Sequence, residues 1–250
     1  DSDNFIALLT EDLGFDVSEI RQLRDDHPQR RPTRKNMLAA LKWLVNGARP
    51  GDHMYLHYSG RGSQQRDSDG DEFDGRDDTL VPCDFQENGT LSDDELRRIL
   101  VQDLPRGARL TLILDCCHGG TALDLPYKVV ARDGDIIDVK KKSAHKLPRA
   151  AAGDVVMLSG CLDAGFGRAG STTGALTTAL KLCLRKRPTA SYHDLLDNMR
   201  KSLKSQGVQQ IPQLSSEHFL KLGDCFMPEA QLPEELPAQP SRPPLRRALT

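Results

Sequence analysis

The sequence predicts an α/β fold in which a mostly parallel central sheet is covered by helices on both faces. Continuous apolar runs typical of buried strands lie at residues 53–58, 109–115 and 154–160. Stretches with the apolar spacing of helices lie before, between and after them. Strands that alternate with helices form parallel sheets with both faces covered, so the pattern favours three layers. The chain has 250 residues, of which 38% are hydrophobic, enough for one domain with a large core.

Helices are predicted from apolar residues that recur every three or four positions. They cover residues 5–13, 33–46, 92–100, 171–184 and 191–206. Ser92 and Glu95 have the spacing of a capping box, which marks the start of the third of these helices. Glycines that follow three of the helices are expected to end them: Gly14, Gly47 and Gly207.

Polar or proline-rich segments separate these elements. Residues 63–90 are predicted to be a polar, acidic connection, and residues 128–149, which contain seven Lys/Arg, an exposed loop. A last strand is predicted at Glu217 to Leu222. From Pro228 onward six prolines occur in 23 residues, a composition typical of a disordered or extended tail.

Composition argues against several classes of function. The net charge of −2 disfavours general binding to nucleic acids or membrane surfaces. No apolar run approaches the roughly 20 residues of a membrane helix. The six cysteines include no Cys-x-x-Cys pair, so we expect reduced cysteines in a cytosolic protein and no structural zinc site. The chain begins at Asp1 without a methionine or a signal-peptide pattern, as a fragment of a longer protein would.

The strand at 109–115 carries reactive groups to its end, because it runs directly into Cys116, Cys117, His118 and two glycines. Ligands in open α/β sheets bind beyond the carboxyl ends of the strands. A thiol at this place needs a base or a strong positive field to become a thiolate at neutral pH. The glycines offer backbone N–H groups to a developing oxyanion. The pattern therefore indicates a candidate nucleophile.

The strand at 53–58 runs into Ser59-Gly60-Arg61, so an arginine stands where the partner base of the thiol is expected. His57 lies four residues before Arg61, about 13 Å away at roughly 3.3 Å per residue, which is too far to assist. His118 adjoins Cys117 and is expected to point to the other side. We interpret His57 as a core histidine with satisfied hydrogen bonds.

These two strand ends, Tyr-Ser-Gly-Arg-Gly at 58–62 and Asp-Cys-Cys-His-Gly at 115–119, resemble those of metacaspases, the caspase-like cysteine peptidases of plants, fungi and protists. Segments at 69–85, 121–127 and 213–216 also follow the family pattern. The resemblance covers roughly residues 1–227. The short linker between the two subunit-like regions is similar to that of type I metacaspases.

The resemblance implies a caspase-like three-layer sandwich with a mostly parallel central sheet and helices on both faces. The single domain at 1–227 comprises a large-subunit-like region (1–127), a basic linker loop (128–153) and a small-subunit-like region (154–227), before a Pro-rich disordered tail (228–250). The first strand of the family fold would precede Asp1 and is expected to be missing, which would leave a sheet edge open.

By the same resemblance Cys117 is the nucleophile, and Arg61 occupies the position of the catalytic histidine. A guanidinium does not deprotonate in proteins, so it cannot act as a general base. Its charge can lower the pKa of the Cys117 thiol, but it cannot return a proton to the leaving group. Loss of general acid–base catalysis alone predicts a rate deficit of about 10²–10⁴.

Seven carboxylates lie within residues 67–78, where they would repel one another without a cation. The residues alone leave open a solvated acidic loop and a metal site. The spacing resembles an EF-hand loop, but Glu72 stands where that loop requires glycine, so we reject this motif. The resemblance to metacaspases implies a calcium site, and hard oxygen ligands suit calcium. Its four aspartates match Asp77, Asp93, Asp94 and Asp124.

The resemblance also implies cleavage after Arg or Lys, which an acidic pocket explains by charge and hydrogen-bond complementarity. Asp115 and Asp1 match the positions of this pocket, and Ser59 is expected to line it. From the residues alone, Asp115 is equally well interpreted as a strand-end cap and Asp1 as a frayed terminus.

Three functional hypotheses follow. The first is a calcium-dependent cysteine endopeptidase, monomeric and cytoplasmic, that acts on proteins or peptides with Arg or Lys at the cleavage site. The second is a catalytically impaired pseudopeptidase with the same fold, which binds calcium or basic peptides, because Arg61 replaces the general base. A redox sensor built on Cys116 and Cys117 is the third, disfavoured because the chain has no resolving Cys-x-x-Cys pair.

Overall fold

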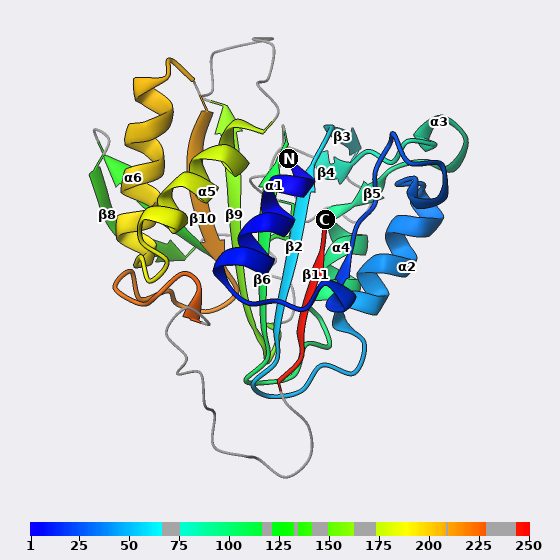
Figure 1. The fold of residues 1–250 in the computed structure, drawn as a ribbon, viewed down its shortest axis with the longest axis horizontal. Coiled ribbons are helices and arrows are strands. Elements are labelled where there is room, and N and C mark those ends of the chain that lie inside the picture. The colour runs from blue at the N-terminus through cyan, green and yellow to red at the C-terminus, as the bar shows by residue number, and fades with distance from the viewer. Residues whose placement is uncertain are drawn as a thin grey trace.

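A computed structural model describes residues 1–66, 76–116, 122–132, 135–141, 150–162, 174–208, 210–228 and 244–250. Within these residues an eight-stranded sheet runs through the middle of the molecule (Figure 1). Its strands, in spatial order, are β1 (Ile20–Arg21), β11 (Arg246–Leu249), β2 (His53–Ser59), β6 (Arg109–Asp115), β9 (Asp154–Leu162), β10 (Gln210–Ser216), β7 (Tyr127–Arg132) and β8 (Asp135–Lys141). Neighbours from β1 to β9 are parallel, and the pairs from β9 to β8 are antiparallel.

Helices cover both faces of this sheet, as predicted. One face carries α1 (Ser2–Ala7), the π-helical turn η1 (Leu8–Asp12), α5 (Ala175–Lys186) and α6 (Tyr192–Ser205); the other carries α2 (Arg34–Val45) and α4 (Asp93–Leu100) (Figure 1). Side chains along β2 point alternately to the two faces and so divide the core. Tyr55 packs against the helices of the first face, whereas Met54 and Leu56 pack on the side of α2 and α4. Strands buried on both faces have continuous apolar sequences, which is why they could be predicted.

Local hydrogen bonds confirm the predicted helix starts. Thr33 Oγ1 accepts a hydrogen bond from the Asn36 N–H, and Ser92 Oγ accepts one from the Glu95 N–H. The Glu95 carboxylate binds Arg34 of α2 at 2.6 Å, so it joins two helices instead of closing a capping box. The three glycines expected to end helices all have positive φ.

The segment predicted to be a polar connection contains a second, three-stranded sheet. It consists of β3 (Gly62–Arg66), β4 (Arg76–Leu80) and β5 (Leu91–Ser92), and a short helix, α3 (Phe85–Asn88), lies between the last two. Side chains of β3 bind carboxylates of β4: Gln64 donates to Asp78 and Gln65 to Asp77. Polar pairs of this kind replace the apolar alternation that usually identifies a strand.

Residues 128–149 were expected to be an exposed loop, and their described part instead forms the hairpin of β7 and β8. Val129 and Val139 face each other across it and are buried. Lys140 next to Val139 is exposed. The seven Lys/Arg of this segment obscured the apolar signal of the two valines in the sequence. Residues 142–149 lie outside the described part of the chain.

The strand predicted at 217–222 is wrong, and β10 ends at Ser216. β10 pairs with β9 along its whole length but with β7 only at Ser215 and Ser216. Pro212 therefore occupies a stretch of β10 that β7 does not cover, where a missing N–H is tolerated. This proline concealed the strand in the sequence.

Part of the expected disordered tail is a strand of the main sheet. β11 lies between β1 and β2, parallel to both, with Ala248 and Leu249 buried. The expected open edge is therefore not found at β2, which pairs with β11 on one side and β6 on the other. Residues 229–243 lie outside the described part of the chain.

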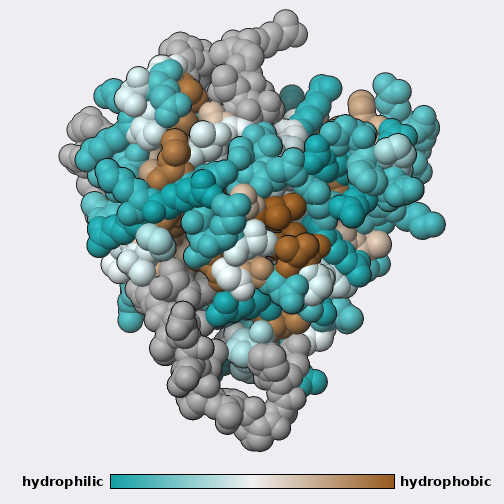
Figure 2. Space-filling model, in the orientation of Figure 1, coloured by the Kyte–Doolittle hydropathy of each residue, from teal (hydrophilic) through white to brown (hydrophobic). Residues whose placement is uncertain are grey.

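The described helices are all too short or too polar to span a lipid bilayer. Figure 2 shows that the face formed by α1, α5 and α6 is mainly hydrophilic, with hydrophobic residues near its centre and at its upper left. These helices therefore bury their apolar sides against the sheet and turn polar sides outward.

Candidate active site and metal centre

The two strand ends that carry the predicted catalytic motifs lie side by side. β2 and β6 are parallel neighbours, and Ser59 at the end of β2 is in register with Asp115 at the end of β6. The segments that follow both strands therefore begin at the same edge of the sheet. Cys116 is buried in the apolar core on the α2 and α4 side, so its thiol is not accessible to substrate. Cys117 lies outside the described residues.

Arg61 follows β2 and has an exposed side chain. Its backbone is fixed because the Arg61 carbonyl accepts hydrogen bonds from the Tyr58 hydroxyl at 2.9 Å and from the Val81 N–H at 3.0 Å. The residue also lines a pocket of about 510 Å³. A permanent positive charge is thus held on a rigid turn beside the strand that leads to Cys117.

His57 is a core histidine, as the sequence analysis concluded. It is buried, stacks on Phe5 with ring centroids 4.7 Å apart, and uses both ring nitrogens: Nδ1 binds Thr250 Oγ1 and Nε2 binds Thr177 Oγ1, each at 2.9 Å. Burial lowers its pKa from 6.5 to about 3. A neutral, fully engaged imidazole cannot exchange protons with a substrate, so His57 does not replace the missing base.

The structure brings together the residues expected to bind substrate. Ser59 Oγ donates a 2.7 Å hydrogen bond to Asp1 Oδ2, and Asp115 lies opposite Ser59 in the sheet. Asp1 also sits against Gly174, where a Cβ would come within 2.2 Å of its carboxylate. Asp1 is therefore held in place in the described structure and does not behave as a frayed end.

The Asp115 carboxylate is buried and accepts hydrogen bonds at both oxygens. Oδ2 accepts from the Thr177 N–H at 2.9 Å and the Thr177 hydroxyl at 2.8 Å, in the first turn of α5, and Oδ1 accepts from Gln210 Nε2 at 3.2 Å. The bonds to Thr177 stabilise the negative charge at a helix N-terminus. Oδ2 thus binds the first turn of α5 and does not cap the strand that carries Asp115.

Gln210 is a site residue that the sequence analysis missed. It lies over Gly160, and a Cβ there would come within 1.9 Å of Gln210 Nε2. Its Oε1 is buried without a hydrogen-bond partner among the described residues. The Gln210 amide thus occupies one hydrogen-bonding position of Asp115 Oδ1. It was missed because only the antiparallel pairing of β10 with β9 brings it near Asp115.

The pocket beside Arg61 is acidic. Four aspartates line it, Asp1, Asp3, Asp25 and Asp26, against two arginines, Arg24 and Arg61. Arg24 is paired with both Asp3 and Asp26 at 2.7 Å. Carboxylates therefore outnumber guanidinium groups in the lining of the pocket, and the field of such a lining attracts cations.

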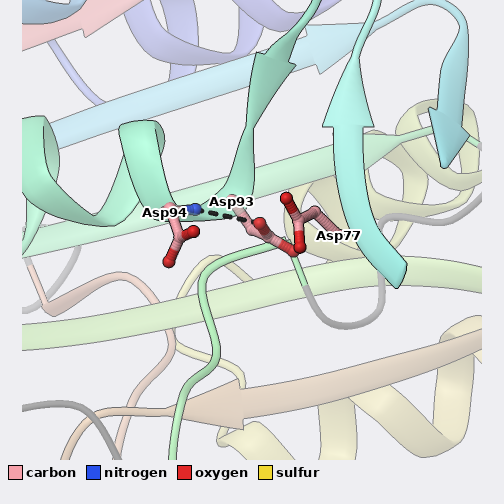
Figure 3. Close-up of side chains that lie close together, drawn as sticks. All are labelled: Asp77, Asp93 and Asp94. Atoms are coloured by element: carbon pink, nitrogen blue, oxygen red, sulfur yellow. Dashed lines mark hydrogen bonds between the residues drawn. The ribbon is translucent and has the colours of Figure 1, made fainter. Parts of the chain in front are cut away.

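Three of the four predicted calcium ligands lie together (Figure 3). Oxygens of Asp77, Asp93 and Asp94 lie within 4.8 Å of one another, and Figure 3 shows Asp93 between the other two. Asp77 comes from β4, while Asp93 and Asp94 open α4 after the Ser92 cap. A cluster of carboxylate oxygens mounted on ordered backbone fits a hard cation such as calcium.

The carboxylate of Asp93 is held firmly but at an electrostatic cost. It accepts backbone N–H bonds from Asp78 at 2.7 Å and Asp94 at 2.9 Å. Burial, together with the neighbouring charges of Asp77 and Asp94, raises its pKa to about 7, although the two N–H bonds oppose the shift. A bound cation would offset both burial and repulsion.

Asp124, the fourth predicted ligand, is not part of this group of three. It has a positive φ of 47°, an unusual backbone conformation for a residue other than glycine. Its neighbour Leu123 is bound to α4, because the Leu123 carbonyl accepts a 3.0 Å hydrogen bond from Arg97. The loop that carries Asp124 is thus attached to the helix that Asp93 and Asp94 open.

Comparison with known proteins places this site in a family. The family described as "Metacaspase, peptidase C14 domain" matches residues 1–126. Metacaspase-1 of Mycosarcoma maydis is 38% identical over 86% of this chain and 64% of its own length. Metacaspase-1 of Kluyveromyces lactis is 37% identical over 91% of this chain and 63% of its own length. A crystal structure of protein GSU0716 from Geobacter sulfurreducens shares the fold, with a TM-score of 0.61 at 21% identity over 89% of this chain and 86% of its own.

The three-layer arrangement, with the ends of β2 and β6 side by side at one edge of the sheet, defines a caspase-like α/β domain. The match over half of its length shows that the chain belongs to the metacaspase family of C14 peptidases. It spans a little less than two thirds of the length of the curated relatives given above.

Proposed function

We propose that this chain is the peptidase domain of a calcium-dependent cysteine endopeptidase that cleaves after Arg or Lys, with Cys117 as nucleophile. The pairing of Ser59 with Asp115 carries the proposal. It places the ends of β2 and β6, which carry the two motifs, beside each other and beside the acidic residues expected to bind substrate. The family match and the surplus of aspartates around the adjacent pocket support it.

The chemistry assigns separate roles to the residues at the strand ends. The positive charge of Arg61 favours the thiolate of Cys117. Asp1, Ser59 and Asp115 supply negative charge and acceptors for the basic side chain of the substrate. Attack by the thiolate on the scissile carbonyl forms a tetrahedral oxyanion, and its collapse expels an amine that requires a proton. A guanidinium does not supply that proton, so water has to, and turnover is slow.

The engagement of His57 favours a second candidate, a pseudopeptidase that binds basic peptides or calcium without turnover. Both of its ring nitrogens are committed and its pKa is about 3. The described part of the chain therefore offers no histidine at the pocket that could act as general base in place of Arg61.

Hydrolysis of an Arg-containing fluorogenic peptide, with calcium and with a chelator, separates the two candidates. For the endopeptidase we expect slow, calcium-dependent cleavage that Cys117→Ala abolishes and Arg61→His accelerates by about 10²–10⁴. Arg66→His, on an exposed position of β3, is the matched control for a new histidine nearby and should leave the rate unchanged. Cleavage by the Arg61→His variant alone would establish the pseudopeptidase.

Calcium titration by calorimetry tests the metal centre separately. We expect Asp94→Ala to weaken binding at least tenfold, whereas Asp103→Ala, an exposed aspartate just after α4, should have no effect.

Asp77→Asn should raise the free energy of unfolding by about 1 kcal/mol in chelator, because it removes repulsion among buried carboxylates, and should abolish stabilisation by calcium. Equal calcium affinity in all the variants would eliminate this site.

A further inference from the structure

The helix α5 begins without a capping side chain of its own. In contrast, α2, α4 and α6 each begin at a residue whose side chain accepts a hydrogen bond from the first turn: Thr33, Ser92 and Ser191. The corresponding residue of α5 is Gly174, which has a positive φ of 90° and no side chain to accept such a bond. Because the N–H groups at a helix start have no partner within the helix, those of α5 need an acceptor from another element.

Asp115, at the end of β6, supplies this acceptor. Thr177 in the first turn of α5 donates both its N–H and its hydroxyl to Asp115 Oδ2, at 2.9 and 2.8 Å. Both residues are almost completely buried, Asp115 with 2% and Thr177 with 1% of its surface exposed. A buried carboxylate is costly unless it is hydrogen-bonded, and the positive end of the helix dipole favours its charge. Oδ2 is therefore fixed, whereas Oδ1 accepts, among the described residues, only the 3.2 Å bond from Gln210.

The start of α5 also locates Asp1. The Asp1 carboxylate fills the space beside Gly174, so a Cβ on Gly174 would collide with it. Its Oδ2 accepts the hydroxyl proton of Ser59 at 2.7 Å. Glycine at the N-cap of α5 thus admits Asp1 to the same helix end that binds Asp115. One turn of helix brings together the two carboxylates expected to bind a basic side chain.

A buried histidine fixes the direction of the Thr177 hydroxyl. An ionised carboxylate only accepts, so the hydroxyl donates its proton to Asp115, and the hydroxyl oxygen accepts from His57 Nε2 at 2.9 Å. His57 Nδ1 is then an acceptor and binds the hydroxyl proton of Thr250, also at 2.9 Å. Every donor in this series has an acceptor, so the series holds the Thr177 hydroxyl toward Asp115.

We propose that Thr177 is a positioning residue for substrate recognition. It holds Asp115 by Oδ2, so that Oδ1 is the oxygen presented to the basic side chain of a substrate. This role rests on the proposed cleavage after Arg or Lys. Thr177 does not touch the substrate and acts through Asp115. Its hydroxyl therefore contributes to the selection of a charged side chain over a neutral one of the same shape.

Two fluorescent peptides that differ in one group measure this selection. One contains arginine, and the other contains citrulline, which has nearly the same shape without the charge. Both are titrated by fluorescence anisotropy into the Cys117→Ala chain, which lacks the proposed nucleophile and should prefer arginine. We expect the added change Thr177→Val to weaken binding of the arginine peptide by about tenfold and to leave the citrulline peptide unaffected. Thr177→Ser should restore the preference, and Thr178→Val, the same change at the exposed next position, should retain it.

The Cys117→Ala chain by itself distinguishes failure of this role from failure of the proposed specificity. Equal binding of both peptides to that chain would overturn the specificity for basic residues, and the role of Thr177 with it. An unchanged preference in Thr177→Val, or equal weakening of both peptides as misfolding would cause, would overturn the role of Thr177 alone. Asp115→Asn removes the charge through which Thr177 acts, so in that background Thr177→Val should change the ratio of the two affinities by less than about twofold. A further loss of about tenfold there would also overturn the role.

Discussion

The imidazole of His57 is held neutral by its surroundings. Phe5 covers one side of the ring, and the hydroxyls of Thr177 and Thr250 take up the two nitrogens. Protonation would place a second N–H against a hydroxyl that already donates to the ring, in a site with little access to water. The residue therefore stabilises the sheet only in its neutral form.

This gives His57 a defined effect on stability. Its pKa is about 3 in the folded chain and about 6.5 in the unfolded one, so between these values the unfolded chain binds more protons. The free energy of unfolding should therefore fall as pH drops from 6.5 toward 3, by up to about 1.4 kcal/mol per pH unit from this group. His57→Gln should lose this component, measured by urea unfolding at pH 7, 5 and 4. His193→Gln, at an exposed site, is the control, and parallel pH profiles for wild type and His57→Gln would contradict the assignment.

Gln210 offers a test of Asp115 as a contact for a basic ligand. Its amide donates to Asp115 Oδ1 while its own carbonyl oxygen lacks a partner in the described structure, so the side chain gains little from its place. We expect Gln210→Ala to free Asp115 Oδ1 for a basic ligand. Binding of an Arg-containing peptide to the Cys117→Ala chain should then tighten by about tenfold, the value of one charge-assisted hydrogen bond. The measurement is fluorescence anisotropy, with Gln213→Ala on the same strand as control. Weaker binding would show that Gln210 itself contacts the substrate.

At the level of elements, α4 connects the cluster of Asp77, Asp93 and Asp94 to the rest of the site. It begins with Asp93 and Asp94 and carries Arg97 one turn later. Arg97 pairs with Glu217 at 3.0 Å and donates to the Leu123 carbonyl, and Glu217 in turn accepts from the Ala151 N–H at 2.8 Å. One buried ion pair thus attaches the loop of Asp124, the end of the linker at Ala151 and the end of β10 to this helix.

Breaking that pair from one side should be costly. Arg97→Met leaves the fully buried Glu217 charge unpaired, so we expect a loss of about 3–5 kcal/mol in the free energy of unfolding. The double variant Arg97→Met/Glu217→Leu should recover most of the loss because it removes both charges. Lys201→Met, which breaks an exposed pair with Asp197, should cost no more than about 1 kcal/mol. Chemical denaturation measures the free energy of unfolding of all three variants. Equal losses in Arg97→Met and Lys201→Met would contradict the role of burial.

The elements that could be predicted are those whose sequence alone specifies their environment. β2, β6 and β9 are buried on both faces, and α2 and α4 begin at residues that cap them, so each is recognisable within its own segment. β10 and β11 cannot be recognised in this way. Pro212 of β10 and the arginines of β11 are tolerated only beside the particular neighbours that the sheet provides. The same holds for the site: the resemblance to metacaspases named Ser59 and Asp115, which the structure pairs, whereas Gln210 reaches Asp115 from a distant strand.

At the scale of the whole molecule, the described residues form two apolar cores that share one sheet. Leu158 of β9 faces the layer of α1, α5 and α6, and Leu112 of the adjacent strand β6 faces the layer of α2 and α4. β6 and β9 are paired from Arg109 to Leu114, so neither layer can separate without exposing strands that the other layer also needs. The two cores should therefore unfold together.

Trp43, the single tryptophan, makes this testable because it lies on α2, in one layer only. Leu158→Ala creates a cavity in the opposite layer and should cost about 2–5 kcal/mol. If the sheet couples the layers, Trp43 fluorescence and far-ultraviolet circular dichroism should shift to the same lower urea midpoint, as they should for Leu112→Ala beside α2. A fluorescence midpoint that stays at the wild-type value in Leu158→Ala while the dichroism midpoint falls would mean that the layers unfold separately. In that case the acidic pocket, which takes residues from both layers, would lose its α1 side while its α2 and β4 side remains folded.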